Sequence, residues 1–161
     1  MIDPAIPHPL WEFTSHGEEE TVDLGRRLGR ACRGGEVILL EGPLGAGKTC
    51  LAGGIAEGLG IDQPAVSPTF VIVRSYGGAR GLTLHHMDFY RLGGDADLET
   101  IGLEDCFAET SVILAEWPSR CPHAFERFSL LLQIDVLDEN TRRLRAWGGG
   151  LALDFTPYRG S

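Results

Sequence analysis

The sequence predicts a single α/β domain, built as a three-layer sandwich in which helices flank a mixed, largely parallel sheet. The first observation is the apolar run Val37–Leu40, which has the length of a buried strand and leads through a glycine-rich loop into a helical stretch. The second is that short apolar runs alternate with helical segments along the rest of the chain, a pattern typical of α/β layers. A length of 161 residues suits one domain with its own core.

Composition narrows the functions that the chain can carry. The 23 Asp and Glu residues outnumber the 14 Lys and Arg residues, and the net charge is -9. This charge argues against a protein that binds nucleic acid without a partner protein, because phosphate contacts need clustered cations. The four cysteines form no CxxC pair, so we predict no zinc site and expect a reducing compartment. The N-terminus lacks a signal-peptide pattern and no apolar stretch is long enough to span a membrane, so we expect a cytoplasmic protein.

The first predicted elements are a short strand at Leu10–Thr14 and a helix that Ser15 and Glu18 open as an S-x-x-E capping box. The helix ends at Gly34-Gly35, and its buried stripe consists of Leu24, Leu28, Ala31 and Cys32. Residues 1–9 and 148–161 are expected to be loose ends, because the first segment is proline-rich and the second begins with three glycines.

The loop after the first buried strand carries the main functional signal. Residues Gly42–Thr49 read GPLGAGKT, the G-x-x-x-x-G-K-T pattern, in which backbone N–H groups and a helix N-terminus surround phosphates. Lys48 should be exposed and reach the β- and γ-phosphates, and the Thr49 hydroxyl should ligate Mg²⁺. The following helix should span Lys48–Leu59, with close backbone packing at Gly53-Gly54. The expected nucleotide contacts of the motif are Gly42, Leu44, Gly45, Ala46, Gly47, Lys48 and Thr49.

Two later apolar runs each end in a carboxylate. LTLHHMD ends in Asp88 and VILAE ends in Glu116, and ligands bind at this end of the strands in open parallel sheets. Either residue alone can be an ordinary exposed acid. Together they favour a pair in which one carboxylate holds the metal and the other orients the attacking water. His85 and His86 are adjacent, so in a strand they face opposite ways and cannot ligate one metal together.

The remaining elements complete the sheet. Ser67–Phe70 reads SPTF, which is either a simple turn or a switch segment whose Ser67 and Thr69 hydroxyls sense the γ-phosphate. Trp117 is interpreted as a core residue rather than a platform for a cofactor. Further strands are predicted at Phe70–Val73, Leu82–Met87, Val112–Ala115, Phe128–Val136 and Arg142–Trp147, with a turn at Gly77–Gly81 and a helix around Asp97–Gly102.

These motifs together resemble the bacterial TsaE (YjeE) ATPases of tRNA threonylcarbamoyladenosine biosynthesis. The GPLGAGKT loop alone is generic, whereas H-x-D-x-Y-R-L followed by E-W after an apolar strand is specific. The resemblance covers roughly residues 13–145. The matching segments are LGRRL (Leu24–Leu28), GPLGAGKT, SPTF, HMDFYRL (His86–Leu92), LEDCF (Leu103–Phe107) and EWP (Glu116–Pro118).

The resemblance implies a P-loop NTPase-like fold and an ATPase that uses ATP and Mg²⁺. It also implies two partner proteins, TsaB and TsaD, which carry threonylcarbamoyl transfer to adenosine 37 of tRNAs that read ANN codons, so tRNA is approached only through them. Thr49 and Glu116 occupy the positions of the metal ligands, and Asp88 that of the residue that activates water. Ser119 and, more weakly, Ser15 fall at nucleotide contacts, and Cys50 stands where relatives often carry a second hydroxyl.

Two other classes stay open from the residues alone. A small-molecule P-loop kinase usually carries an arginine-rich lid, whereas the arginines at 74, 80, 91 and 120 are dispersed. A nucleotide switch that docks without hydrolysis has no need of both Asp88 and Glu116. Because no arginine stands next to the loop motif in the sequence, we expect slow hydrolysis by the chain alone and stimulation by its partners.

Overall fold

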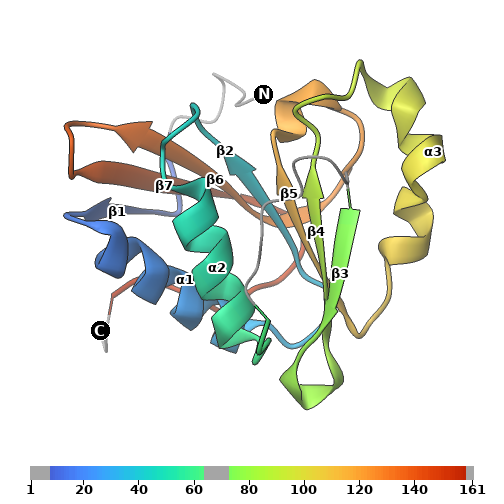
Figure 1. Ribbon diagram of the computed structural model, residues 1–161, viewed down its shortest axis with the longest axis horizontal. Helices are drawn as coiled ribbons and strands as arrows, with labels where there is room; N and C mark the ends of the chain where they lie inside the picture. The colour runs from blue at the N-terminus through green and yellow to red at the C-terminus, as the bar shows by residue number, and fades with distance from the viewer. Residues whose placement is uncertain (1–7, 64–72, 159–161) are drawn as a thin grey trace.

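The computed structural model describes residues 8–63 and 73–158, so the predicted switch residues Ser67 and Thr69 lie outside the described residues. Seven strands form one sheet (Figure 1): β1 (Trp11–Ser15), β2 (Val37–Glu41), β3 (Val73–Gly77), β4 (Thr83–Asp88), β5 (Ser111–Glu116), β6 (Phe128–Val136) and β7 (Arg142–Gly149). The helices are α1 (Glu18–Ala31), α2 (Lys48–Gly58) and the four-residue α3 (Leu98–Ile101). Short 3-10 turns are η1 (Ala79–Gly81), η2 (Asp95–Asp97), η3 (Leu103–Cys106) and η4 (Pro118–Arg120).

The sheet is mixed, with a parallel centre and antiparallel flanks. Its strand order is β1-β7-β6-β2-β5-β4-β3. The neighbours among β6, β2, β5 and β4 are parallel, whereas β1–β7, β7–β6 and β4–β3 are antiparallel. The α/β prediction is therefore confirmed, although the parallel part is confined to the four central strands. Two of the three antiparallel pairs are hairpins, because a short turn connects their strands: the predicted turn near Gly77–Gly81 joins β3 to β4, and another short turn joins β6 to β7. The third pair, β1–β7, joins the two ends of the chain.

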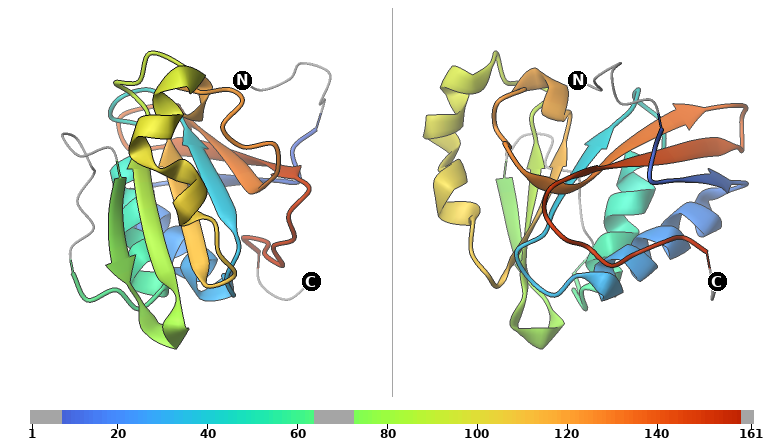
Figure 2. Two further views of the ribbon diagram at one scale, coloured as in Figure 1. Left: turned by 90° about the vertical axis from the view of Figure 1, so that its right-hand side faces the viewer. Right: turned by 180° about the vertical axis from the view of Figure 1, so that it is seen from behind.

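The central strands are buried on both faces, which creates the three layers. On β2, Ile38 and Leu40 pack in the cluster beneath α1 and α2, while Val37 and Leu39 pack in a second cluster on the opposite face. Figure 2 shows α1 and α2 together on one side of the sheet and the α3 segment on the other. A strand of continuous apolar residues is what a two-sided core requires.

Helices α1 and α2 contact each other through glycines. A Cβ added at Gly54 of α2 would lie 2.2 Å from the Val22 carbonyl oxygen of α1, and one at Gly29 of α1 would lie 2.3 Å from the Ile55 carbonyl oxygen of α2. The predicted close packing is thus confirmed at Gly54. It is wrong for Gly53, where an added Cβ meets no described atom within 4 Å.

The start of α1 differs from the predicted capping box. Its N-cap is Gly17, and no described side chain caps it. The Ser15 hydroxyl is buried, donates to the Gly17 carbonyl at 2.8 Å and lies 2.7 Å from the Thr21 hydroxyl. Glu20, rather than Glu18, reaches back and accepts a hydrogen bond from the His16 N–H. Ser15 is the last residue of β1, so its hydroxyl points beneath the helix instead of capping it.

Several other boundaries shift. The helix expected around Asp97–Gly102 is only the four residues of α3, because Gly102 adopts a left-handed conformation with φ 68° and ends it. Strand β7 continues to Gly149, past the expected start of the loose C-terminal end. In that segment the Phe155 ring packs against Trp11, with centroids 5.8 Å apart. None of the helices in the described part of the chain has the length and apolar character needed to cross a membrane.

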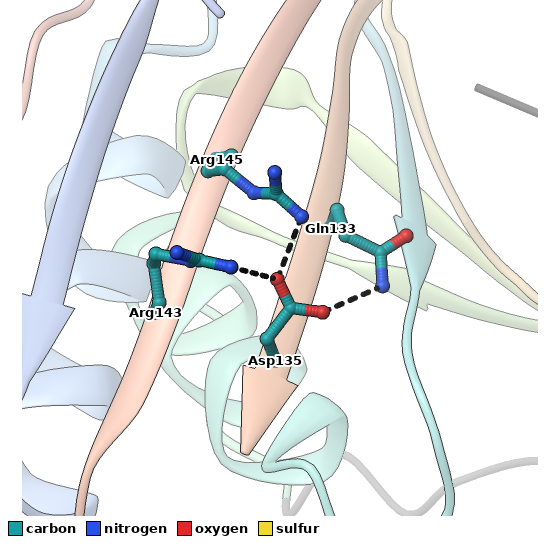
Figure 3. A network of polar contacts seen from close by, with 4 residues as sticks. All are labelled: Gln133, Asp135, Arg143 and Arg145. Atoms are coloured by element: carbon teal, nitrogen blue, oxygen red, sulfur yellow. Dashed lines mark hydrogen bonds and ion pairs between the residues drawn. The ribbon is translucent and has the colours of Figure 1, made fainter. Parts of the chain in front are cut away.

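The β6–β7 hairpin carries a polar network on the face away from α1 and α2 (Figure 3). Asp135 accepts from Arg143 at 3.3 Å, from Arg145 at 2.7 Å and from Gln133 at 3.3 Å. Because side chains alternate along β7, the preceding residue Arg142 faces the opposite side, toward α2.

Candidate nucleotide-binding site

The GPLGAGKT loop joins the carboxyl end of β2 to the N-terminus of α2. Gly45 and Gly47 have φ values of 78° and 105°, the left-handed region in which glycine is favoured. Gly47 is the N-cap of α2, and no described side chain caps the helix there. The first N–H groups of α2 are therefore available to an anion, and the helix dipole favours negative charge at this position.

Lys48 lies inside the loop rather than at the surface. Its exposure is 6%, so the prediction of an exposed side chain is wrong. The ammonium donates to the Gly42 carbonyl at 2.6 Å and lies 3.7 Å from the centroid of the Trp117 ring. Burial lowers the pKa of Lys48, an effect opposed by the charges of Glu116, Glu41 and Asp88. The Lys48 ammonium therefore bonds the first residue of the loop, Gly42, and three carboxylates are close enough to affect its charge.

The two predicted strand-end carboxylates do come together. Asp88 and Glu116 are register partners at the ends of the parallel strands β4 and β5, and Glu116 is also aligned with Leu40 of β2. Asp88 is partly buried and accepts from the Tyr90 N–H at 2.9 Å, and burial raises the pKa of its carboxyl. Glu116 is 3% exposed and bonds His86 Nε2 at 2.7 Å.

Trp117 has a place in the site that was not predicted. It adopts a left-handed backbone with φ 57°, and its ring lies 4.9 Å from the Tyr90 ring as well as beneath Lys48. It also packs against the core cluster on the α3 side, so the interpretation as a core residue was incomplete. The available sequence signal was its position directly after the strand-end acid Glu116.

Two further polar residues of the site, Glu41 and Arg142, were not predicted. The Ser119 hydroxyl, a predicted nucleotide contact, donates to Glu41 at the end of β2, and the second carboxylate oxygen of Glu41 is buried without a partner among the described residues. Arg142 donates from Nε to the Ala46 carbonyl at 3.1 Å and from Nη2 to the Gly45 carbonyl at 3.3 Å. An arginine thus lies beside the loop, contrary to what the sequence suggested, because the sheet brings the start of β7 there.

The remaining predicted contacts differ in accessibility. Thr49 is exposed and Cys50 is partly buried, and both line a hollow of about 430 Å³ beside α2. Burial raises the pKa of the Cys50 thiol. Leu44 is 72% exposed at the loop tip. Ser15 is buried against Thr21, so its predicted nucleotide contact stays a prediction.

The donor set suits a magnesium–polyphosphate better than a metal held by protein alone. Within residues 8–63 and 73–158, no three His, Cys, Asp or Glu side chains converge to hold a metal. Mg²⁺ in phosphoryl-transfer sites is usually bound by one or two carboxylates or hydroxyls together with phosphate oxygens. Thr49, Glu116 and Asp88 are the groups near the loop that fit such a partial ligand set.

Comparisons with known proteins identify the family of the chain. Residues 15–144 match the family profile described as threonylcarbamoyl adenosine biosynthesis protein TsaE. A tRNA threonylcarbamoyladenosine biosynthesis protein TsaE from Treponema pallidum is 37% identical over 130 residues, covering 81% of this chain and 95% of the relative. The protein of the same name from Mycobacterium leprae is 38% identical over 137 residues, covering 80% and 84%. The crystal structure of Bacillus subtilis YdiB matches with a TM-score of 0.68 at 30% identity, covering 86% of each chain. The chain therefore belongs to the TsaE family.

Proposed function

We propose that this protein is a Mg²⁺-dependent ATPase that supports threonylcarbamoyl transfer to adenosine 37 of ANN-decoding tRNAs by the TsaB–TsaD complex. One observation carries the proposal. The uncapped α2 N-terminus, Lys48 and two strand-end carboxylates converge at the carboxyl ends of the central strands. Family membership and the names of the relatives support the tRNA pathway.

The roles follow from the position of each group. The loop N–H groups and Lys48 would bind the phosphates, with Lys48 exchanging its bond to the Gly42 carbonyl for phosphate oxygens. Thr49 and Glu116 would hold Mg²⁺, which would neutralise charge on the β- and γ-phosphate oxygens. Asp88 would orient the attacking water, because it lies beside Glu116 in the neighbouring strand. Ser119, Cys50 and Ser15 are proposed as secondary nucleotide contacts.

The direct test is ATP binding and phosphate release by the purified chain with and without Mg²⁺. Lys48→Ala should abolish or greatly reduce turnover in a folded protein, and Glu116→Ala should weaken binding chiefly when Mg²⁺ is present. Arg143→Gln, on the opposite face of the sheet, serves as the control. Wild-type turnover in a folded Lys48→Ala variant would contradict the proposal.

Partner stimulation is the second part of the proposal. The Arg142 guanidinium donates to carbonyls of the loop and of the β6–β7 turn, including Gly45, Ala46 and Asp138, so its three nitrogens are engaged with backbone carbonyls. A charge supplied in trans can accelerate phosphoryl transfer by roughly 10³–10⁵-fold. We expect TsaB–TsaD to stimulate hydrolysis and to bind the chain more tightly with an ATP analogue than with ADP. Equal affinities and unstimulated hydrolysis would contradict this role but not the ATPase.

A further inference from the structure

One buried histidine contacts the proposed metal ligand. His86 lies on β4 and is 1% exposed, and its Nε2 is 2.7 Å from Oε2 of Glu116, which is 3% exposed. Because a carboxylate oxygen accepts, the imidazole Nε2 donates this hydrogen bond. The other ring nitrogen, Nδ1, is buried without a partner in the described part of the chain. The polar function of the ring is therefore directed at Glu116.

The pairing follows from the register of the sheet. His86 is aligned with Leu114, and the next residue of β5 on the same face, Glu116, is aligned with Asp88. His86 and Glu116 are thus diagonal neighbours on adjacent parallel strands, on the face that carries Leu84 and Leu114 beneath α2. The neighbouring His85 points to the other face, where it contacts the hydroxyls of Ser75 and Ser111 at 2.7 and 3.3 Å.

The Glu116 carboxylate needs a hydrogen-bond donor that fixes its orientation. Its side chain has several rotatable bonds, and a buried carboxylate requires hydrogen-bond donors. Lys48 is close enough for the charge of Glu116 to raise the lysine pKa, so the two groups attract each other. A carboxylate that turned onto Lys48 would occupy the lysine needed for phosphate. The bond to His86 uses one oxygen and leaves acceptor capacity on the carboxylate for a metal.

We propose that His86 is a positioning residue that fixes the Glu116 carboxylate for Mg²⁺. This inference rests on the proposed function, because it takes Glu116 as a metal ligand. When a residue that hydrogen-bonds a metal-ligating side chain is removed, metal affinity typically falls by about 10–100-fold. The loss of such a residue has less effect on the part of nucleotide binding that needs no metal.

The experiment measures nucleotide affinity across a Mg²⁺ titration and in EDTA, for wild type and for four variants. His86→Leu should raise the Mg²⁺ concentration at half-maximal effect by about 10–100-fold, while affinity in EDTA changes by less than about twofold. His86→Gln should retain most of the Mg²⁺ effect, because its amide nitrogen can reach the place of Nε2. His86→Asn, with a shorter side chain, should not. His85→Gln is the matched control and should behave as wild type.

The outcomes separate the two proposals. If wild type shows Mg²⁺-dependent binding and folded His86→Leu shows the same dependence, the role of His86 is overturned while the proposed function stands. A parallel loss of affinity with Mg²⁺ and in EDTA would show a merely structural role and overturn it too. If His86→Leu does not fold, the Gln and Asn variants decide, since equal Mg²⁺ dependence in both contradicts the inference. Binding by wild type without any Mg²⁺ effect would overturn both proposals.

Discussion

At the scale of single residues, Asp88 is a carboxylate whose ionisation is disfavoured by folding. Burial raises the pKa of Asp88, and the charge of Glu116 acts in the same direction. An ordinary Asp carboxyl ionises near pH 3.9. As pH rises from that value through the higher pKa of the folded state, the folded state therefore loses stability relative to the unfolded chain. Ionisation of Asp88 thus costs the folded state stability, and the proposed role in orienting water would need that charge.

We predict that Asp88→Asn raises the free energy of unfolding at pH 7 by less than about 1 kcal/mol, because the carboxyl is only partly buried. The amide oxygen can still accept from the Tyr90 N–H. Urea denaturation at pH 7 and pH 5 should show a gain that shrinks at the lower pH. Phosphate release should fall strongly while nucleotide binding is retained. A variant less stable than wild type at pH 7 would contradict the sign of this effect.

Arg142 gives a second prediction at this scale. Its donors bond the Gly45 and Ala46 carbonyls, so we expect it to fix the orientation of the peptide groups in the loop. Arg142→Gln should weaken nucleotide binding by about tenfold, equivalent to about 1.4 kcal/mol. Arg143→Gln is a neighbouring control, because Arg143 bonds Asp135 on the other face (Figure 3). Calorimetric titration measures both, and equal affinities for the two variants would show that Arg142 does not support the loop.

The sequence predicts the site residues that lie in one motif or end one apolar run. It does not predict the residues that the sheet brings to the site from distant parts of the chain. The glycines, Lys48 and Thr49 belong to one motif, and Asp88 and Glu116 each end a recognisable apolar run. Arg142 stands 96 residues after Ala46, and nothing in its own surroundings indicates a role. The burial of Lys48 involves the ring of Trp117, whose centroid lies 3.7 Å from the ammonium, and the sequence gives no indication of this contact.

At the scale of elements, α1 and α2 form a pair whose separation is set by glycine. Gly25 and Gly29 of α1 face Gly54 and Gly58 of α2, and an added Cβ at any of the four would lie within 2.2–2.5 Å of a backbone oxygen of the partner helix. The sequence indicated contact near Gly54 but not its partner, because the glycines of α1 carry no signal apart from their spacing. The close contact fixes the position of α2, and with it the helix N-terminus at the proposed phosphate site.

Two adjacent glycines provide a matched test of this packing. We predict that Gly54→Ala destabilises the protein by about 1–3 kcal/mol, because its methyl group would overlap the Val22 carbonyl. Gly53→Ala should stabilise it by about 0.5–1 kcal/mol, because that site is open among the described atoms and alanine favours the helix. Thermal and urea unfolding of both variants give the comparison. Similar effects of the two substitutions would rule out the proposed helix contact.

At the scale of the whole molecule, the strand order assembles the site from distant parts of the chain. Strands β2, β5 and β4 lie side by side, so the loop and both carboxylates lie together at the carboxyl ends of these inner strands. Apolar runs that alternate with helical segments predicted a mixed, largely parallel sheet, and the four central strands are parallel. The antiparallel flanks were only partly predicted, because β1 joins β7 from the opposite end of the chain and local patterns give no indication of that pairing.

The C-terminal segment, residues 150–158, has a consequence for the self-association of the protein. Strand β1 is an edge of the sheet, and an uncovered strand edge is a template on which another chain can add a strand. The segment runs back along α1 (Figure 2), its Phe155 ring covers Trp11, and the Tyr158 hydroxyl donates to the Glu12 carbonyl of β1. We therefore expect this segment to hinder the addition of a strand from another copy of the protein at β1.

Deleting residues 151–161 should accordingly leave nucleotide binding intact but produce dimers and larger aggregates whose amount rises with protein concentration. Tyr158→Phe, which removes only the hydroxyl bond to Glu12, should show a smaller effect of the same kind. Light scattering over a concentration series measures this. A truncated chain that scatters as the full chain does would mean that the edge is protected by the twist and shortness of β1 alone.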